Sequence, residues 1–138
     1  MHVYEGVDGI KRYYELMYVK TLGRGDTHYS MFVPKSSNEK YEAHMLEWHT
    51  YRIKKGIKAK YLYNQEDRRY GAVRARMKGT EVRYMRDDAI TPVYLEFFGD
   101  YAAIVNSGDE PYVFVMHGKG VVKTFKHVFE TYWVLAEK

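Results

Sequence analysis

Hydrophobic side chains recur at helical spacing in three stretches of the chain. In the first stretch Val7, Ile10, Tyr14 and Met17 lie on one face of a helix. The second stretch covers residues 39–55 and ends at Gly56, where a C-terminal cap is expected. The third, residues 119–136, has the most continuous apolar face. The pattern therefore predicts three amphipathic helices, the last of them at the C-terminus.

Shorter apolar or alternating runs predict strands between and after these helices. They cover residues 27–33, 57–63, 80–85, 93–98, 102–105 and 112–116. The pattern is weak between residues 64 and 78, where we predict a short helix at 71–78. Helices alternate with strands first, and hairpin-like turns join the later strands. This order predicts a mixed α/β fold in which helices flank a single mixed sheet.

The composition is that of one globular domain. A chain of 138 residues is long enough for one hydrophobic core, and 46% hydrophobic with 29% charged residues argues against disorder. The absence of cysteine excludes disulfides and thiolate metal sites. No apolar run approaches the roughly 18 residues of a membrane span, and no signal peptide is recognisable. Together these features predict a cytoplasmic protein with no membrane partner.

The positive charge is concentrated in one segment. Residues 52–86 hold twelve basic and three acidic residues, a net charge of +9, whereas the whole chain carries +4. Such a segment can bind phosphates or another anion, or it can form a solvated surface. A nucleic-acid interface would use four arginines of this segment: Arg68, Arg69, Arg74 and Arg76.

Two residues of the second predicted helix are our candidate ligand contacts. His49 lies on the inner stripe of that helix and Arg52 follows one turn later, with Arg83 as a further donor. His49 could instead be a hydrogen-bonded core histidine. The many tyrosines could form pocket walls, the edge of the core or a dimer surface: Tyr13, Tyr14, Tyr61, Tyr63 and Tyr94. Aromatic walls with a few fixed donors suit a sugar or an anionic metabolite.

The sequence lacks the motifs of common catalytic and metal sites. His44 and His49 are five residues apart, which separates them by about 140° around a helix, so we expect no metal site. The glycines have neither the spacing nor the lysine of nucleotide-binding loops. His117-Gly-Lys119 begins the H-x-K-x4-D string of phospholipase D enzymes, but Thr124 stands at the aspartate position. We therefore expect no catalytic residue and no cofactor.

Four short motifs follow one another along the chain. They are Val3-Tyr-Glu-Gly-Val-Asp-Gly-Ile10, Arg52-Ile-Lys-Lys-Gly-Ile57, Gly99-Asp-Tyr-Ala-Ala-Ile104 and Phe125-Lys-His-Val-Phe-Glu-Thr-Tyr-Trp133. In this order they resemble the C-terminal effector domain of TrmB-type archaeal transcriptional regulators. The resemblance spans nearly the whole chain.

The resemblance implies a phospholipase D-like α/β fold without catalysis. It places the three catalytic positions of the active relatives at Thr91, Val93 and Phe98, whose side chains cannot perform those steps. It also implies that residues 1–138 form a single effector domain. No DNA-binding helix-turn-helix precedes that domain in this chain, so DNA would be contacted only through a separate or missing one.

Three functions follow from the residues and the resemblance. The leading hypothesis is a non-enzymatic domain of a transcriptional regulator that senses a small-molecule effector, forms a homodimer, or does both. The alternative is a nucleic-acid-binding module that uses the basic segment 52–86. The second alternative is a phosphodiesterase of the phospholipase D type, in which His117 and Lys119 would be the remaining catalytic pair.

Overall fold

A computed structural model describes residues 2–87 and 91–138, and these form a seven-stranded mixed sheet. The strand order is β1-β7-β6-β5-β2-β3-β4. The pairs β2–β3 and β3–β4 are parallel and the other four are antiparallel. The strands are β1 (His2–Glu5), β2 (Thr27–Val33), β3 (Lys58–Tyr63), β4 (Thr80–Tyr84), β5 (Val93–Phe98), β6 (Tyr101–Asn106) and β7 (Tyr112–His117).

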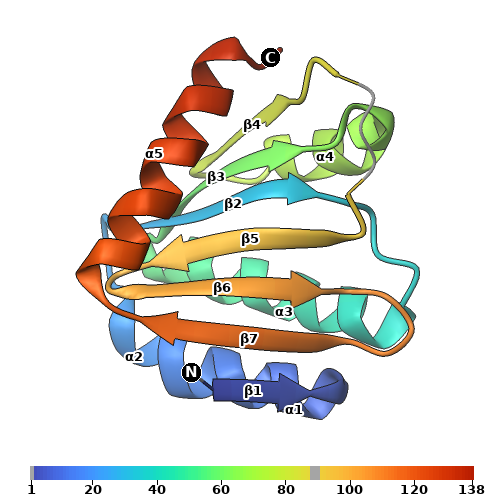
Figure 1. Cartoon of the computed structure of the whole chain (residues 1–138). Helices are drawn as coiled ribbons and strands as arrows, with labels where there is room; N and C mark the ends of the chain where they lie inside the picture. The colour runs from blue at the N-terminus through green and yellow to red at the C-terminus, as the bar shows by residue number, and fades with distance from the viewer. Residues whose placement is uncertain (1, 88–90) are drawn as a thin grey trace.

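Helices cover the two faces of the sheet unequally (Figure 1). One face carries α1, α3 and α4, with η1 and α2 continuing α1, and the other face carries α5. The helices are α1 (Gly6–Tyr13), η1 (Tyr14–Tyr18), α2 (Val19–Thr21), α3 (Glu39–Lys55), η2 (Gln65–Asp67), α4 (Arg68–Ala75) and α5 (Lys119–Leu135). We call the first face the helix side and the second the α5 side.

Local sequence sets both ends of α3, the helix that carries most of the candidate site. The Asn38 side chain accepts a hydrogen bond from the backbone N–H of Tyr41, 3.1 Å away, as an N-cap residue does. At the other end Gly56 adopts a left-handed conformation with φ of 77°. A glycine tolerates this conformation without strain, so the chain turns there and enters β3.

The core on the helix side is unusually rich in tyrosine. Tyr13 and Tyr18 are fully out of solvent, and Tyr18 stacks on Phe98 of β5 with ring centroids 3.8 Å apart. Further buried tyrosines from α3, β3 and β5 complete this layer: Tyr41, Tyr61, Tyr63 and Tyr94. Because each ring carries a hydroxyl, burial of so many tyrosines demands hydrogen-bond partners inside the protein.

On the α5 side, α5 crosses the sheet diagonally (Figure 1). Phe129 is the α5 residue that becomes fully buried, and it packs on Phe97 of β5 and on Trp133. After the helix, the backbone of Glu137 forms an antiparallel bridge with Tyr84 at the outer edge of β4. The side chains of Arg68 and Arg86 both contact the Glu137 carboxylate.

The predicted fold class, a mixed α/β fold with one mixed sheet and a C-terminal helix, is confirmed. Two local assignments differ. Residues 2–5 form the edge strand β1, although they are too few and too exposed to show an apolar pattern. The short helix α4 begins at Arg68 and ends at Ala75, three residues earlier than predicted, because Gly79 with φ of 72° opens the turn into β4. In the described residues, no helix is long and apolar enough to cross a membrane.

Candidate functional site

A small cavity lies on the helix side, between the sheet and helices α3 and α4. It offers about 20 Å³ of space to water, which is room for about one water molecule. Strands β2, β3 and β5 form its floor, and α3 and α4 form its roof. The aromatic and polar side chains that line it include His28, Ser30, Tyr41, His49, Tyr61, Tyr63, Tyr70, Arg74, Tyr94 and Ser107. We call this cavity the tyrosine chamber.

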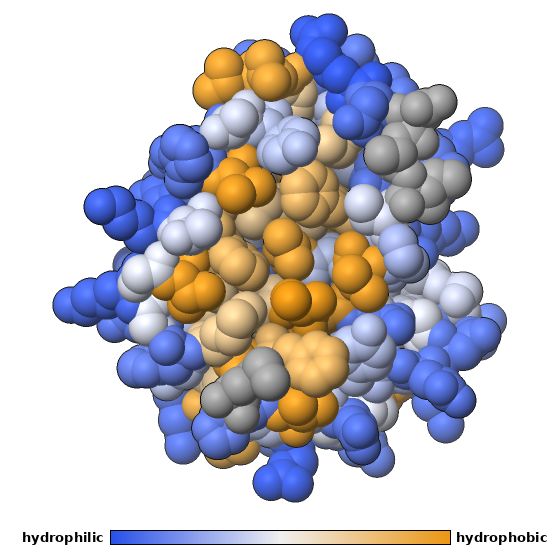
Figure 2. Space-filling view, in the orientation of Figure 1, coloured by the Kyte–Doolittle hydropathy of each residue, from blue (hydrophilic) through white to orange (hydrophobic). Residues whose placement is uncertain are grey.

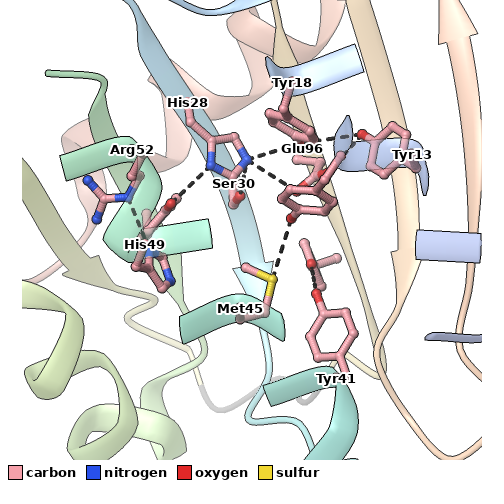
Figure 3. Close-up of polar contacts among 12 residues, drawn as sticks. Tyr13, Tyr18, His28, Ser30, Tyr41, Met45, His49, Arg52 and Glu96 are labelled. Atoms are coloured by element: carbon pink, nitrogen blue, oxygen red, sulfur yellow. Dashed lines mark hydrogen bonds and ion pairs between the residues drawn. The ribbon is translucent and has the colours of Figure 1, made fainter. Parts of the chain in front are cut away.

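His49 presents a free N–H to the tyrosine chamber. Its Nδ1 accepts a hydrogen bond from Nε of Arg52 at 3.0 Å (Figure 3), so in the neutral ring the proton sits on Nε2. That Nε2 has no hydrogen-bond partner among the described residues, although the side chain is only 2% exposed. Burial and the neighbouring Arg52 charge hold the pKa of His49 well below its usual value, which keeps the ring neutral.

Arg52 lies behind His49 and does not itself line the chamber. It is fully buried, and its guanidinium donates to His49, to the carbonyl of Ile57 and to the hydroxyl of Thr80. It makes no carboxylate contact within residues 2–87 and 91–138. A buried cation without an anion is costly, and its field favours negative charge nearby. Arg52 therefore polarises the His49 N–H that faces the chamber.

Arg74 of α4 is the second cation of the chamber, and Glu42 of α3 holds it. The side chain of Arg74 is 3% exposed and that of Glu42 is 25% exposed. Nη2 of Arg74 contacts Oε1 of Glu42 and lies 3.0 Å from the hydroxyl of Tyr70, which donates to the other Glu42 oxygen. In the described structure, Nε and Nη1 of Arg74 have no acceptor. The N–H donors of the Arg74 guanidinium are thus only partly hydrogen-bonded.

A buried network around Glu96 and His28, which itself lines the chamber, continues from the chamber wall (Figure 3). Nδ1 of His28 lies 2.9 Å from the hydroxyl of Tyr61, and Nε2 lies 3.2 Å from Oε1 of Glu96. The hydroxyl of Tyr13 donates to Oε2 of Glu96 at 2.8 Å, and that of Tyr18 lies 3.0 Å from Nε2 of His28. Every polar atom of this pair is engaged, so its role is to hold Tyr61 in place at the chamber wall.

The hydroxyls of two other lining residues are free. Tyr63 and Ser107 are both buried, and neither side-chain hydroxyl has a partner in the part of the chain that the structure describes. Burial raises the pKa of Tyr63 well above its usual value, so its hydroxyl stays protonated. With His49 and Arg74, the chamber therefore holds four groups that can donate hydrogen bonds to an incoming molecule.

The structure brings some of the predicted site residues together and separates others. His49 lines the chamber and Arg52 supports it. Arg83 lies on the α5 side, where its Nη1 donates to the carbonyl of Trp133 at 2.7 Å and its guanidinium covers the Trp133 ring. It is therefore far from His49 across the sheet.

The four arginines predicted for a nucleic-acid interface do not share one environment. Arg74 is buried in the chamber wall, and Arg68 is held by Glu137 and by the ring of Tyr84. Arg69 and Arg76 are exposed. The basic segment is thus partly internal, because α4 turns one of its arginines into the core.

The positions that the resemblance links to catalysis lie on β5 or just before it. The hydroxyl of Thr91 donates to the carbonyl of Phe32 at 2.7 Å, Val93 begins the strand, and Phe98 is buried under Tyr18. His117 and Lys119 are exposed at the junction of β7 and α5. Among the residues that can be placed, no group of three or more histidine, aspartate or glutamate side chains could hold a metal ion.

Sequence reasoning missed His28, Glu42 and Glu96. Glu96 carries a readable signal, because it falls at an inward position of the apolar strand 93–98, where a carboxylate needs buried partners. His28 shows the same signal on β2. Glu42 carries no such signal in the sequence, because acidic residues are common in the first turns of helices.

The comparisons with known proteins give a likeness of fold. No family model matches the chain, and no curated protein matches it. Among solved structures it is similar to TrmBL2, described as an archaeal chromatin protein whose structure shows a novel mode of DNA binding. The TM-score is 0.62 at 14% sequence identity. The match covers 99% of this chain and 52% of TrmBL2, so the chain spans about half the length of that protein.

Proposed function

We propose that this chain is a non-enzymatic effector domain of a TrmB-type transcriptional regulator, and that the tyrosine chamber binds its small-molecule effector. The observation that carries the proposal is His49, a 2%-exposed lining side chain whose Nε2–H has no hydrogen-bond partner among the described residues, next to further unpartnered donors in the same cavity. The fold likeness to TrmBL2, a chromatin protein by its description, supports a regulator. DNA contact would then belong to a helix-turn-helix outside this domain.

A thermal-shift screen of sugars and anionic metabolites tests the proposal. A molecule that binds the native state alone stabilises it by about 2.7 kcal/mol at one hundred times its dissociation constant. His49→Phe should abolish the shift, because it fills similar space without the N–H. His127→Phe, an exposed histidine on α5, should keep it. The absence of any shift across the screen contradicts the proposal.

Self-association is the second part of the proposed function. The α5 side of strands β5 to β7 carries side chains without charge, and Figure 2 shows an apolar area there inside a hydrophilic rim. Those side chains are Val93, Leu95, Phe97, Ala102, Ile104, Asn106, Tyr112, Phe114 and Met116. An uncharged face of this kind can pack on its own copy without charge repulsion.

Light scattering after size exclusion tests the homodimer. We expect a dimer that Ile104→Lys converts to a monomer, because the lysine places a charge in the middle of the shared face. Lys126→Glu, on the exposed side of α5, should leave the dimer intact. A parent protein that stays monomeric at high concentration removes this part of the proposal.

The nucleic-acid alternative gives a different result. A phosphate-binding surface loses affinity steeply as salt rises, and Arg69→Ala with Arg76→Ala should weaken it because these two side chains are exposed. Retained binding in that double variant, or no binding at low salt, excludes the basic segment as the interface.

A further inference from the structure

We propose that the tyrosine chamber is an anion-binding site in which the carboxylate of Glu42 occupies the place of the ligand's acidic group. This inference rests on the proposed function, that the chamber takes a small molecule, and adds its chemical class and the group that it displaces. The ligand would be a compact molecule with one acidic group, a carboxylate or a phosphate, and a further hydrogen-bond acceptor.

The first argument is the way Glu42 binds Arg74. A guanidinium offers five N–H donors in a planar fork that suits two oxygens at once. Glu42 reaches one nitrogen of that fork, Nη2, and shares it with the Tyr70 hydroxyl. In the described chain Nε and Nη1 of Arg74 stay without an acceptor. An oxyanion that approaches from the chamber can satisfy more of the fork than Glu42 does.

The second argument is the charge around the chamber. Two cations, Arg52 and Arg74, lie in or directly behind its wall. Glu96 is committed to His28 and Tyr13, so within residues 2–87 and 91–138 Glu42 is the remaining carboxylate seen to contact the wall. If Glu42 leaves, Arg74 in the wall and Arg52 behind it have no anion in contact among the described residues. A ligand that brings one negative charge restores the balance that Glu42 now supplies.

The third argument is the alignment of α3. Glu42 and His49 are seven residues apart, two turns along the inner stripe of the helix, which places their backbones about 10 Å apart along its axis. An acidic group at Arg74 and Tyr70 would therefore leave the rest of the ligand pointing toward the free N–H of His49. This distance suits a phosphorylated sugar or a hydroxy acid of similar length.

The fourth argument is space. The chamber holds about one water molecule while Glu42 is in place, so a ligand of that length requires a side chain to move. Glu42 is the natural candidate, because its side chain is 25% exposed against 3% for Arg74, so it can turn into solvent without leaving α3. Displacement of Glu42 would thus vacate the oxyanion position at Arg74 and Tyr70, two residues of the chamber wall.

Calorimetric titration of the whole chain tests this inference. The probes are inorganic phosphate, citrate, glucose 6-phosphate and glucose, at constant ionic strength so that screening stays equal. Glucose 6-phosphate should bind, and Glu42→Gln should tighten its binding about tenfold, because the amide competes less for Arg74. Glu47→Gln makes the same charge change on the exposed side of α3 and should leave the dissociation constant unchanged. Arg74→Gln should abolish binding.

The outcomes separate this inference from the proposed function. If glucose binds equally well to the parent and to Glu42→Gln, and none of the three anions binds, the anion site is wrong. The proposed function, a chamber that binds a small-molecule effector, then still stands. Equal effects of Glu42→Gln and Glu47→Gln on the dissociation constant overturn the proposal that the ligand displaces Glu42. If Glu42→Gln fails to fold, Glu42→Asp serves instead, since its shorter carboxylate cannot reach both Arg74 and Tyr70. That variant should also tighten binding, and unchanged binding overturns the inference.

Discussion

Nε2 of His28 lies 3.2 Å from Oε1 of Glu96, and both side chains are closed off from solvent. The pair joins the middle strands β2 and β5, which are neighbours in the sheet but distant in sequence. Tyr13 and Tyr18 bring the first helical segment onto the same pair. A single polar cluster thus ties three parts of the chain together beneath the chamber.

Replacing Glu96 by Gln should lower the free energy of unfolding by about 1–3 kcal/mol, because the amide cannot accept from both His28 and Tyr13 as the carboxylate does. Urea denaturation measures this change. Glu130→Gln on the exposed side of α5 is the matched control and should leave the stability unchanged. Equal effects of the two substitutions would show that the buried cluster contributes nothing specific.

The stability should fall in acid because of His49. Burial and the Arg52 charge lower the pKa of this ring well below 6.5, so the native ring stays neutral while the unfolded ring takes up a proton below about pH 6.5. The stabilisation is therefore present above that pH and is lost as the pH falls, by up to about 1.4 kcal/mol per pH unit for one histidine. His44, whose pKa burial also lowers, adds to the slope.

Denaturation of the parent and of His49→Gln at a series of pH values from 7.5 to 5 tests this expectation. Gln still offers an oxygen to Nε of Arg52 but does not titrate. The variant should show a flatter profile over this range. A profile as steep as that of the parent would assign the acid sensitivity to other groups.

The buried tyrosines should make the fold sensitive to alkali. Burial raises the pKa of Tyr61 to about 12, and it raises the pKa of each of the other members of the core cluster above the ordinary 10. Those others are Tyr13, Tyr14, Tyr18, Tyr41, Tyr63 and Tyr94. Groups with a raised native pKa stabilise the fold below the unfolded value and withdraw that contribution as the pH rises above about 10.

We therefore expect these tyrosines to ionise together as the protein unfolds. Absorbance at the phenolate band and circular dichroism should change over the same narrow range of pH. Gradual ionisation with an intact dichroism spectrum would mean that solvent reaches the core without unfolding.

Two glycines should respond to alanine in opposite directions. A Cβ at Gly71 of α4 would lie 2.6 Å from Cε1 of Tyr84, whereas one at Gly120 of α5 would meet nothing within 4 Å. Alanine favours a helix by up to about 1 kcal/mol over glycine. Gly120→Ala should therefore raise the melting temperature, and Gly71→Ala should lower it because the Tyr84 ring must move. Tyr84→Ala should reduce the cost of Gly71→Ala, as a double-mutant cycle would show.

Regular elements of the fold could be predicted because their side chains repeat. The apolar faces of α3 and α5 and the short runs of β5 to β7 follow helix and strand periods. The edge strand β1 and the start of α4 could not, since tertiary contacts rather than apolar periodicity define them. β1 exists because it pairs with β7, more than 100 residues later.

The candidate site could be predicted only where a polar residue interrupts an apolar face. His49 could be predicted in this way, and Glu96 shows the same signal in the sequence. The partnership of Arg74 with Glu42 could not be foreseen, because it depends on how α4 packs beside α3 and brings residues 32 positions apart together. Arg83 looked equivalent to Arg52 in sequence, yet strand alternation sends it to the opposite face.

The bridge between Tyr84 and Glu137 has a consequence for aggregation. β4 is an outermost strand, and an unprotected outer strand can recruit a strand from another molecule. The backbone of Glu137 takes up both hydrogen-bonding groups of Tyr84, with N–O separations of 2.6 and 2.8 Å, while Arg68 and Arg86 hold its side chain from either side. Strand addition at this margin must therefore first release the tail of α5. The segment after the last helix thus protects the β4 edge against intermolecular strand pairing.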